Sequence, residues 1–207
     1  MMKKTLFSLL AVALTVTLFA DVELPAPQKK GGMPLMEALN ARKTIRKYEA
    51  KELSLQQISD LLWAAFGVNR KDGKRTAPTA VNAQELTIFV LLKKGTFRYD
   101  AEKNTLVEIN KKDLRKLAAP RFEAPLTLII ASDTTRQSRM KDPAKRIHYS
   151  DVDTGYVSQN IYLYCASAGL GTVAIGGVAD RGEKIRAELG LAETVYPVLG
   201  HAVGIPK

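Results

Sequence analysis

The sequence predicts a single α+β domain in which helices flank a mixed sheet of four or five strands. Apolar residues recur at helical spacing in several segments, whereas β-branched and aromatic residues gather in other, shorter ones. The two kinds of segment follow one another without an internal repeat, and 207 residues are enough for one sizeable core. We therefore expect one domain built around one sheet.

The helices are predicted from their start and stop signals. Ser54 is a good N-cap, Gln57 stands three residues later in the position of a capping box, and Gly67 is a natural stop. Pro34 suits the first turn of a helix because its fixed φ is already helical. The expected helices are one that opens at Pro34 and others over Ser54–Gly67, Asn110–Ala118, Asp153–Gly169 and Ala179–Leu189.

The strands are predicted from composition. Pro125–Ser132 is continuously apolar, which is typical of a strand buried on both faces. Leu86–Leu92 is rich in β-branched and aromatic residues, and Thr96–Ile109 is expected to form a hairpin that turns around residues 102–104. Thr194–Val203 is expected to be the last strand.

The N-terminus has the pattern of a secretory signal peptide. Residues 1–4 are basic, Thr5–Phe19 is uncharged and apolar, and the small residue Ala20 follows. We expect residues 1–20 to be removed on export, so that the mature protein is periplasmic and has no stable membrane insertion. An uncleaved anchor is the alternative, although the run is short for a membrane span. Residues 21–33 then form a leader, and residues 34–207 form the domain.

Charge and cysteine content exclude several classes of function. The net charge is +10, but the basic residues are scattered, and no nucleic-acid-binding motif accompanies them. We therefore expect no nucleic-acid partner. The single cysteine, Cys165, rules out an intrachain disulfide and argues against metal ligation by thiolates, and we expect no metal site; it lies in an apolar run and is expected to be buried.

Three segments carry residue types that suit one anionic, aromatic ligand. Arg42, Thr44 and Arg46 alternate where the first helix is expected to end, and two guanidiniums with a hydroxyl would compensate a phosphate. The loop Arg75–Gln84 offers amides for the polar edge of a heterocycle, and the glycines of Gly169–Gly177 would let backbone approach a flat ring. Taken alone, the first segment would be a solvated basic face.

In this order, the three segments resemble the motifs of the nitroreductase family of flavoproteins. The matching stretches are Ala41–Tyr48, Ala77–Gln84, Asp153–Gly155 with Gln159–Asn160, and Gly169–Thr172 with Ile175–Gly177. The resemblance extends from Pro34 to Lys207, which is essentially the whole mature domain. The hairpin around Tyr99-Asp100 is similar to the subgroup related to peptide-azoline dehydrogenases.

The resemblance implies a homodimer that holds one FMN per subunit at its interface, with both chains contributing to each site. By position, the phosphate and ribityl chain would be bound by Arg42, Lys43, Thr44 and Arg46. The partner chain would line the flavin with Pro78, Thr79, Ala80 and Asn82, with Gln84 close by. Gly176 and Gly177 would present backbone to the reactive N5 region, and Lys207 would reach the phosphate.

The resemblance also implies a chemistry without a catalytic side chain, because the flavin N5 itself takes and gives the hydride in two half-reactions. The expected partners are NAD(P)H or another electron donor and a small-molecule acceptor. Export makes NAD(P)H an awkward donor, so a flavin-dependent dehydrogenase of an exported peptide or small molecule is one alternative. A non-catalytic basic binding protein on the same fold is the other.

The sequence departs from the family pattern at Glu85-Leu86, where many relatives have proline and an aromatic residue. No long insertion is present, so walls of the substrate pocket are expected from Val68–Gly73 and Ala119–Ala124.

Outside these motifs, His148 is interpreted as a surface loop histidine, with a proton donor as the alternative. Arg136–Lys141 is interpreted as a solvated loop that could attract an anionic substrate.

Overall fold

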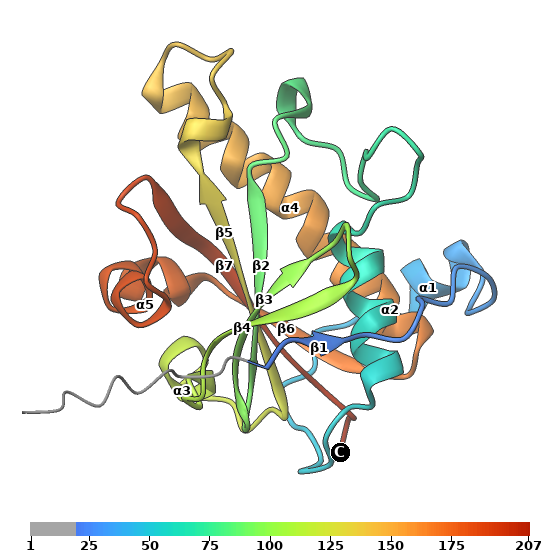
Figure 1. Ribbon diagram of the computed structural model, residues 1–207. Coiled ribbons are helices and arrows are strands. Elements are labelled where there is room, and N and C mark those ends of the chain that lie inside the picture. Colours follow the sequence, from blue (N-terminus) through green and yellow to red (C-terminus); the bar gives the residue numbers. More distant parts are fainter. Residues whose placement is uncertain (1–19) are drawn as a thin grey trace, which may run out of the picture.

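The computed structural model describes residues 20–207, and it has a seven-stranded sheet with helices on both faces (Figure 1). The strand order is β1-β4-β3-β2-β5-β7-β6, and all six strand pairings in residues 20–207 are antiparallel. The strands are β1 Val22–Glu23, β2 Leu86–Leu92, β3 Gly95–Asp100, β4 Thr105–Asn110, β5 Leu126–Asp133, β6 Gly171–Ile175 and β7 Val195–Gly204.

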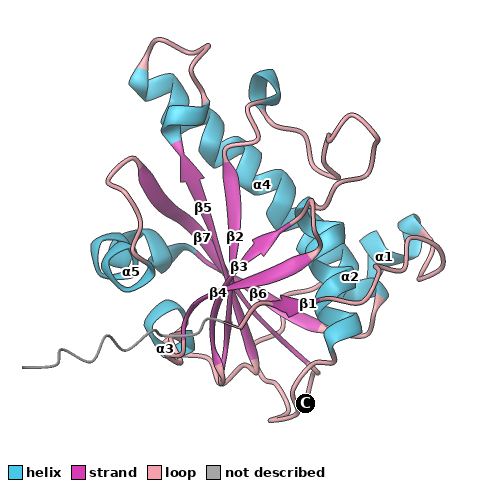
Figure 2. Ribbon diagram, in the orientation of Figure 1, coloured by secondary structure: helices cyan, strands magenta, loops and turns pink. Residues whose placement is uncertain are grey.

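The helices form two layers. The α-helices are α1 Leu35–Ala41, α2 Leu55–Phe66, α3 Arg115–Ala118, α4 Pro143–Ser167 and α5 Gly182–Leu189, and the 3-10 helices are η1 Ala80–Asn82, η2 Thr134–Arg136 and η3 Gly176–Arg181. In Figures 1 and 2, α1, α2 and α4 cover one face of the sheet, and α3 and α5 cover the other. No helix within residues 20–207 is both long and apolar enough to cross a lipid bilayer.

Two apolar cores separate the sheet from its helical layers. Central strand β5 contributes to both, because Leu128 and Ile130 face α2 and α4 while Ile129 faces α3 and α5. Burial on both faces explains the continuous apolar run that predicted this strand. The capping box of α2 is confirmed: the Ser54 hydroxyl accepts from Gln57 N, and the Gln57 side chain accepts from Ser54 N.

The α+β class is confirmed, but the number and direction of the strands differ from expectation. The additional strands are β1, from the predicted leader, and β6, from a glycine segment that the sequence offered as ligand-binding. Strand β1 has only two residues and β6 has only five, so both are too short for periodicity to reveal them. The sheet is antiparallel rather than mixed because β7 lies between β5 and β6, the two strands that run in the same direction and are joined through α4.

Two predicted helices have wrong boundaries. The helix expected from Asn110 begins only at Arg115, because Asn110 ends β4 and pairs with Thr96. The long helix begins at Pro143 instead of Asp153, since the Asp142 carboxylate accepts from Ala144 N and Pro143 fills the first turn. His148 therefore lies on α4 rather than in a loop, exposed and edge-to-face with Tyr149. The predicted signal peptide, apart from Ala20, lies outside the described residues.

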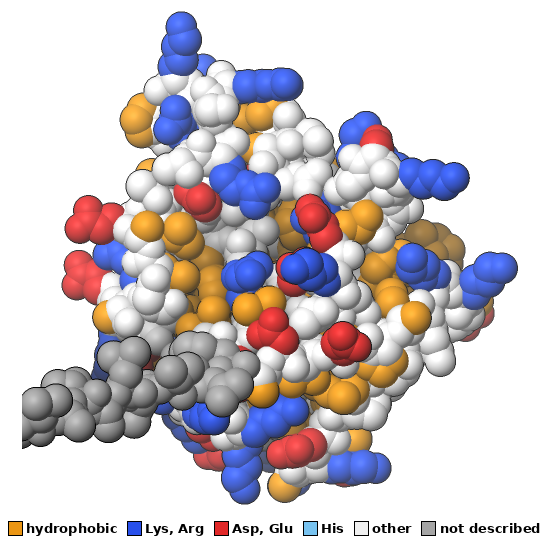
Figure 3. Space-filling view, in the orientation of Figure 1, with side chains coloured by type: hydrophobic (Ala, Val, Ile, Leu, Met, Phe, Trp, Pro, Cys, Tyr) orange, Lys and Arg blue, Asp and Glu red, His pale blue; other side chains and the backbone are white. Residues whose placement is uncertain are grey.

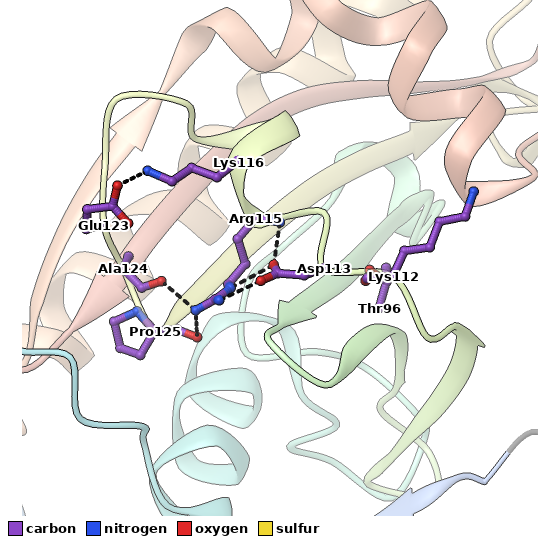
Figure 4. Close-up of polar contacts among 8 residues, drawn as sticks. All are labelled: Thr96, Lys112, Asp113, Arg115, Lys116, Glu123, Ala124 and Pro125. Atoms are coloured by element: carbon purple, nitrogen blue, oxygen red, sulfur yellow. Dashed lines mark hydrogen bonds and ion pairs between the residues drawn. The ribbon is translucent and has the colours of Figure 1, made fainter.

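A polar network fixes the connection from α3 to β5 (Figure 4). Arg115 pairs with Asp113 at 2.6 Å and donates to the carbonyl oxygens of Ala124 at 3.1 Å and Pro125 at 3.3 Å. Lys116 contacts Glu123 along the same segment. The connection between residues 119 and 124 is thereby held against β5, which positions it beside the site described below.

Candidate functional site

The first and third predicted segments lie side by side in one chain. Ile45 N donates to Thr172 O on β6 at 2.9 Å, so the segment after α1 runs along the edge strand of the sheet. Gly171 makes this approach possible: a Cβ at that position would lie 2.7 Å from Ile45 Cγ2. A side chain there would displace the segment, so the glycine is explained by a close contact between chain segments.

Tyr162 of α4 contacts both the segment after α1 and strand β6. Its hydroxyl lies 3.2 Å from Thr44 Oγ1 and accepts from Ala174 N at 3.0 Å. The Arg42 guanidinium lies over the same ring, 5.4 Å from its centroid, in cation–π geometry. One side chain therefore positions two predicted phosphate-binding residues against β6. No sequence motif marked Tyr162, which stands in an apolar helical run.

A cavity of about 440 Å³ opens where these segments end. Arg46 contributes from the first segment, Gly176 and Gly177 contribute from the end of β6, and residues 120–122 form a wall. The volume is within the range of small-ligand sites, roughly 300–1,000 Å³. The wall at 120–122 agrees with the pocket wall expected from Ala119–Ala124, whereas residues 68–73 do not line this cavity.

The glycine pair leaves its backbone accessible. A Cβ on Gly176 would meet nothing within 4 Å, so this residue faces open space. A Cβ on Gly177 would come within 3.2 Å of Arg181 Nη1, whose guanidinium also donates to the carbonyl oxygens of Leu117 and Ala118 at 2.9 and 3.0 Å. Arg181 thus ties the glycine turn to α3 and gives the cavity a fixed basic edge.

The C-terminus returns to the first segment. Tyr48 forms an isolated β-bridge with Pro206, and Lys207 N donates to Lys47 O at 3.3 Å. The Tyr48 hydroxyl is within 2.6 Å of Ile45 O, its hydrogen-bond acceptor. The structure therefore places Lys207 beside residues 42–48, although its side chain is exposed to solvent.

The second predicted segment is a strained loop. Val81, Asn82 and Gln84 all have positive φ, at 51°, 54° and 48°, and this is a rare conformation for the β-branched valine. Two bonds hold the loop in shape: Thr79 Oγ1 accepts from Gln84 N at 2.9 Å, and Asp153 Oδ2 accepts from Ala80 N at 2.7 Å. Strain of this kind persists where the surroundings impose it, often at functional sites.

Within one protomer this loop does not reach the cavity. Its anchor on α4 is Asp153, whereas the first segment contacts Tyr162, nine residues further along that helix. At 1.5 Å per residue, the two positions are about 14 Å apart along the helix axis. Pro78, Thr79, Ala80 and Asn82 are absent from the cavity lining, as is Gln84. The loop instead presents the exposed Val81 and Asn82 to solvent.

A buried carboxyl pair lies under the strained loop. Glu85 is 0% exposed, and neither of its carboxylate oxygens has a hydrogen-bond partner. Burial, reinforced by the neighbouring carboxyl of Asp153, raises the pKa of Glu85 to about 7. Burial therefore favours the neutral, protonated form of the Glu85 carboxyl. The sequence flagged Glu85 as a departure but gave no sign of its burial.

His201 is the second buried titratable group. The ring bonds Ser158 Oγ at 2.9 Å through Nε2 and Thr172 Oγ1 at 3.0 Å through Nδ1. Because Thr172 donates its own proton to Ala202 O, the histidine donates from Nδ1 and accepts at Nε2. Burial lowers the pKa of His201 to about 3, so the neutral ring fastens α4 to β6 and β7.

Cys165 and Trp63 have structural roles. Cys165 is buried as predicted, and burial raises the pKa of its thiol, which removes it as a nucleophile. Trp63 donates from Nε1 to Val68 O at 3.0 Å and closes the turn after α2. The segment of residues 136–141 is largely exposed, except that Gln137 is fully buried.

The sequence and the fold match known proteins. A model of the nitroreductase family matches residues 39–205. The chain is 31% identical over 197 residues to a Methanocaldococcus jannaschii protein named "Putative nitroreductase MJ1384", covering 89% of this chain and 96% of that one. It is 22% identical to an FMN reductase [NAD(P)H] of Bacillus subtilis strain 168, covering 83% of this chain and 66% of that one.

Solved structures agree. The crystal structure of a "putative nitroreductase" from Ralstonia eutropha JMP134 superposes with a TM-score of 0.85 at 35% identity, and the match covers 90% of both chains. The NADPH:FMN oxidoreductase from Vibrio harveyi shares the fold, with a TM-score of 0.62 at 23% identity over 84% of this chain and 69% of that one.

The family match, together with the FMN reductase and FMN oxidoreductase among the relatives, supports an oxidoreductase of flavin-dependent type. The chain belongs to the nitroreductase family.

Proposed function

We propose that this protein is an FMN-dependent oxidoreductase of nitroreductase type, which passes electrons from a donor to a small-molecule acceptor. The observation that carries the proposal is the fastening of residues 42–46 along β6, which puts Arg46 and the Gly176-Gly177 pair on one cavity. When bound, FMN would supply hydride transfer at N5 in two half-reactions.

The residues of this chain would bind and orient the cofactor. Arg46 brings a guanidinium to the cavity, while Arg42 and Thr44, which do not line it, are positioned beside β6 by Tyr162; the phosphate would find charge-assisted donors along this segment. Lys43 and Lys207 would add positive charge from the same end of the molecule. The open face of Gly176 would let backbone lie against a flat ring.

The proposal includes a homodimer with FMN at the interface. Large apolar side chains are exposed on α1 and α4, among them Met36 at 75%, Leu35 at 64% and Tyr156 at 48%. Val81, at the tip of the strained loop, is 49% exposed. A second copy would bury these side chains and would bring the loop of residues 78–82, with Gln84 behind it, to the flavin of its partner.

Electron donor and location remain proposals drawn from the sequence. NAD(P)H is the donor named for the B. subtilis relative, and the signal pattern of residues 1–20 predicts an exported, periplasmic protein. These two features conflict unless another donor acts in the exported protein. A flavin-dependent dehydrogenase of an exported substrate would resolve the conflict, because the substrate itself would then supply the hydride.

The test of the cofactor site is a pair of matched variants. Arg42→Ala combined with Arg46→Ala removes both guanidiniums, and Lys47→Ala removes one exposed charge from the same segment as a control. A hydrogen bond to a charged group contributes roughly 1.5–3 kcal/mol, so the double variant should bind FMN at least tenfold more weakly. We expect the double variant to purify with little FMN and Lys47→Ala to purify with the wild-type amount.

The result that contradicts this site is full FMN occupancy in the double variant. A wild-type protein that takes up no FMN at all would instead favour the basic binding protein on the same fold.

A further inference from the structure

Strands β2 and β3 separate partway along their length. Their ladder runs from Leu92↔Gly95 to Phe89↔Arg98 and stops there. Beyond that point β2 stays paired with β5 as far as Leu86, and β3 stays paired with β4 as far as Asp100. Within residues 20–207, no strand fills the gap between the two diverging edges. Figure 2 shows the β3–β4 hairpin turning away from β2.

The gap forms a cleft of about 250 Å³ whose lining holds more basic than acidic side chains. Arg75 enters from the loop after α2, Arg98 from β3 and Arg136 from η2, so three elements far apart in sequence each supply a guanidinium. Figure 3 shows charged side chains gathered in the middle of this face of the molecule. None of the ion pairs within 4.0 Å in residues 20–207 involves these three arginines.

The nearby acids do not neutralise the cleft. Asp100 uses Oδ1 to accept from Glu102 N and Lys103 N at 3.1 Å each, which closes the hairpin turn. Glu102 lines the cleft but is exposed to solvent. Three guanidiniums against two carboxylates leave an excess positive charge at a concave surface, where an anion would be attracted.

Arg75 is the anchor of this arrangement. Its Nε donates to Gln84 Oε1 at 2.9 Å, and its guanidinium lies over the Phe66 ring, 5.5 Å from the centroid. Its Nη1 is buried and has no hydrogen-bond partner. Packing over Phe66 accounts for the position of the side chain, but it leaves this donor unsatisfied, and a buried donor without an acceptor costs free energy.

We propose that the cleft between β2 and β3 binds a small ligand through an oxyanion, either a carboxylate or a phosphate, held by Arg75, Arg98 and Arg136. Planar guanidiniums donate in pairs to both kinds of group, and the three arginines approach the cleft from three different elements. Because Arg75 also donates a hydrogen bond to Gln84, a ligand in the cleft would be linked through Arg75 to the strained loop.

The test is calorimetric titration of the full purified protein with inorganic phosphate and, separately, with succinate, at an ionic strength held constant with chloride. Arg98→Gln and Arg136→Gln each remove one guanidinium, and Arg139→Gln removes an exposed arginine three residues beyond Arg136 as the control. We expect one-to-one binding to the wild type, roughly tenfold weaker binding to each cleft variant and no change for the control.

The two probes separate the sources of the oxyanion: binding of phosphate alone assigns a phosphate ligand, and binding of succinate alone assigns a carboxylate. The absence of binding by both probes at millimolar concentration overturns the proposal, as does equal weakening in Arg139→Gln or unchanged binding in the cleft variants. The FMN content of each variant is measured in parallel. If the FMN content of a cleft variant is unchanged while its anion binding is lost, the cleft and the flavin cavity bind different ligands.

Discussion

The buried Glu85 carboxyl makes the stability of the protein fall as the pH rises. In the unfolded chain this group has its ordinary pKa of 4.5, whereas burial raises the pKa in the fold to about 7. Between these values the folded protein holds a proton that the unfolded chain has released, so each pH unit lowers the free energy of unfolding by up to about 1.4 kcal/mol. Over the whole window, the loss is on the order of 2–3 kcal/mol.

Glu85→Gln isolates this effect because a neutral amide resembles the protonated acid in shape and does not titrate. Urea unfolding of both proteins from pH 5 to pH 8 should show the wild type losing stability relative to Glu85→Gln as the pH rises. Glu49→Gln, at an exposed position, is the control and should follow the wild type. Parallel curves for the wild type and Glu85→Gln would refute the inference that Glu85 keeps its proton in the fold.

Two further predictions concern the contacts that build the site. Burial lowers the pKa of His201 to about 3, so below pH 6.5 the unfolded chain takes up a proton that the folded protein does not, and the free energy of unfolding should drop as the pH falls. His201→Gln should make the free energy of unfolding, measured with urea, depend less on pH in this range. An unchanged pH dependence would contradict the prediction. Gly171→Ala places a Cβ 2.7 Å from Ile45 Cγ2 and should cost about 1–3 kcal/mol with loss of FMN, whereas Gly176→Ala, with open space around its Cβ, should leave stability unchanged; equal stability of the two variants would refute the close contact.

Local signals predicted those parts of the fold that short-range chemistry determines. The Ser54 capping box specifies where α2 begins whatever surrounds it, and the apolar run of β5 requires burial on both faces. The start of α4 at Pro143 was also present locally, in Asp142 followed by proline, but the polar and charged residues that follow obscured the helical pattern. Strand β6 depends on pairing with β7, which no local pattern encodes.

The candidate site was predictable only in part, for the same reason. The residue types of the first and third segments indicated a phosphate and a flat ring, and the structure brings Arg46 and Gly176 to one cavity. The support from Tyr162 comes from a helix more than a hundred residues away in sequence, so only tertiary packing reveals it. The burial of Glu85 and the unpaired Nη1 of Arg75 are likewise properties of the folded chain.

The measurement that tests the central claim most directly is the visible absorption spectrum of the purified protein, with the released chromophore identified by chromatography. The account predicts a yellow protein that releases about one FMN per subunit, the stoichiometry that the proposed flavin site in each chain implies. A colourless protein that cannot be reloaded with FMN would contradict it.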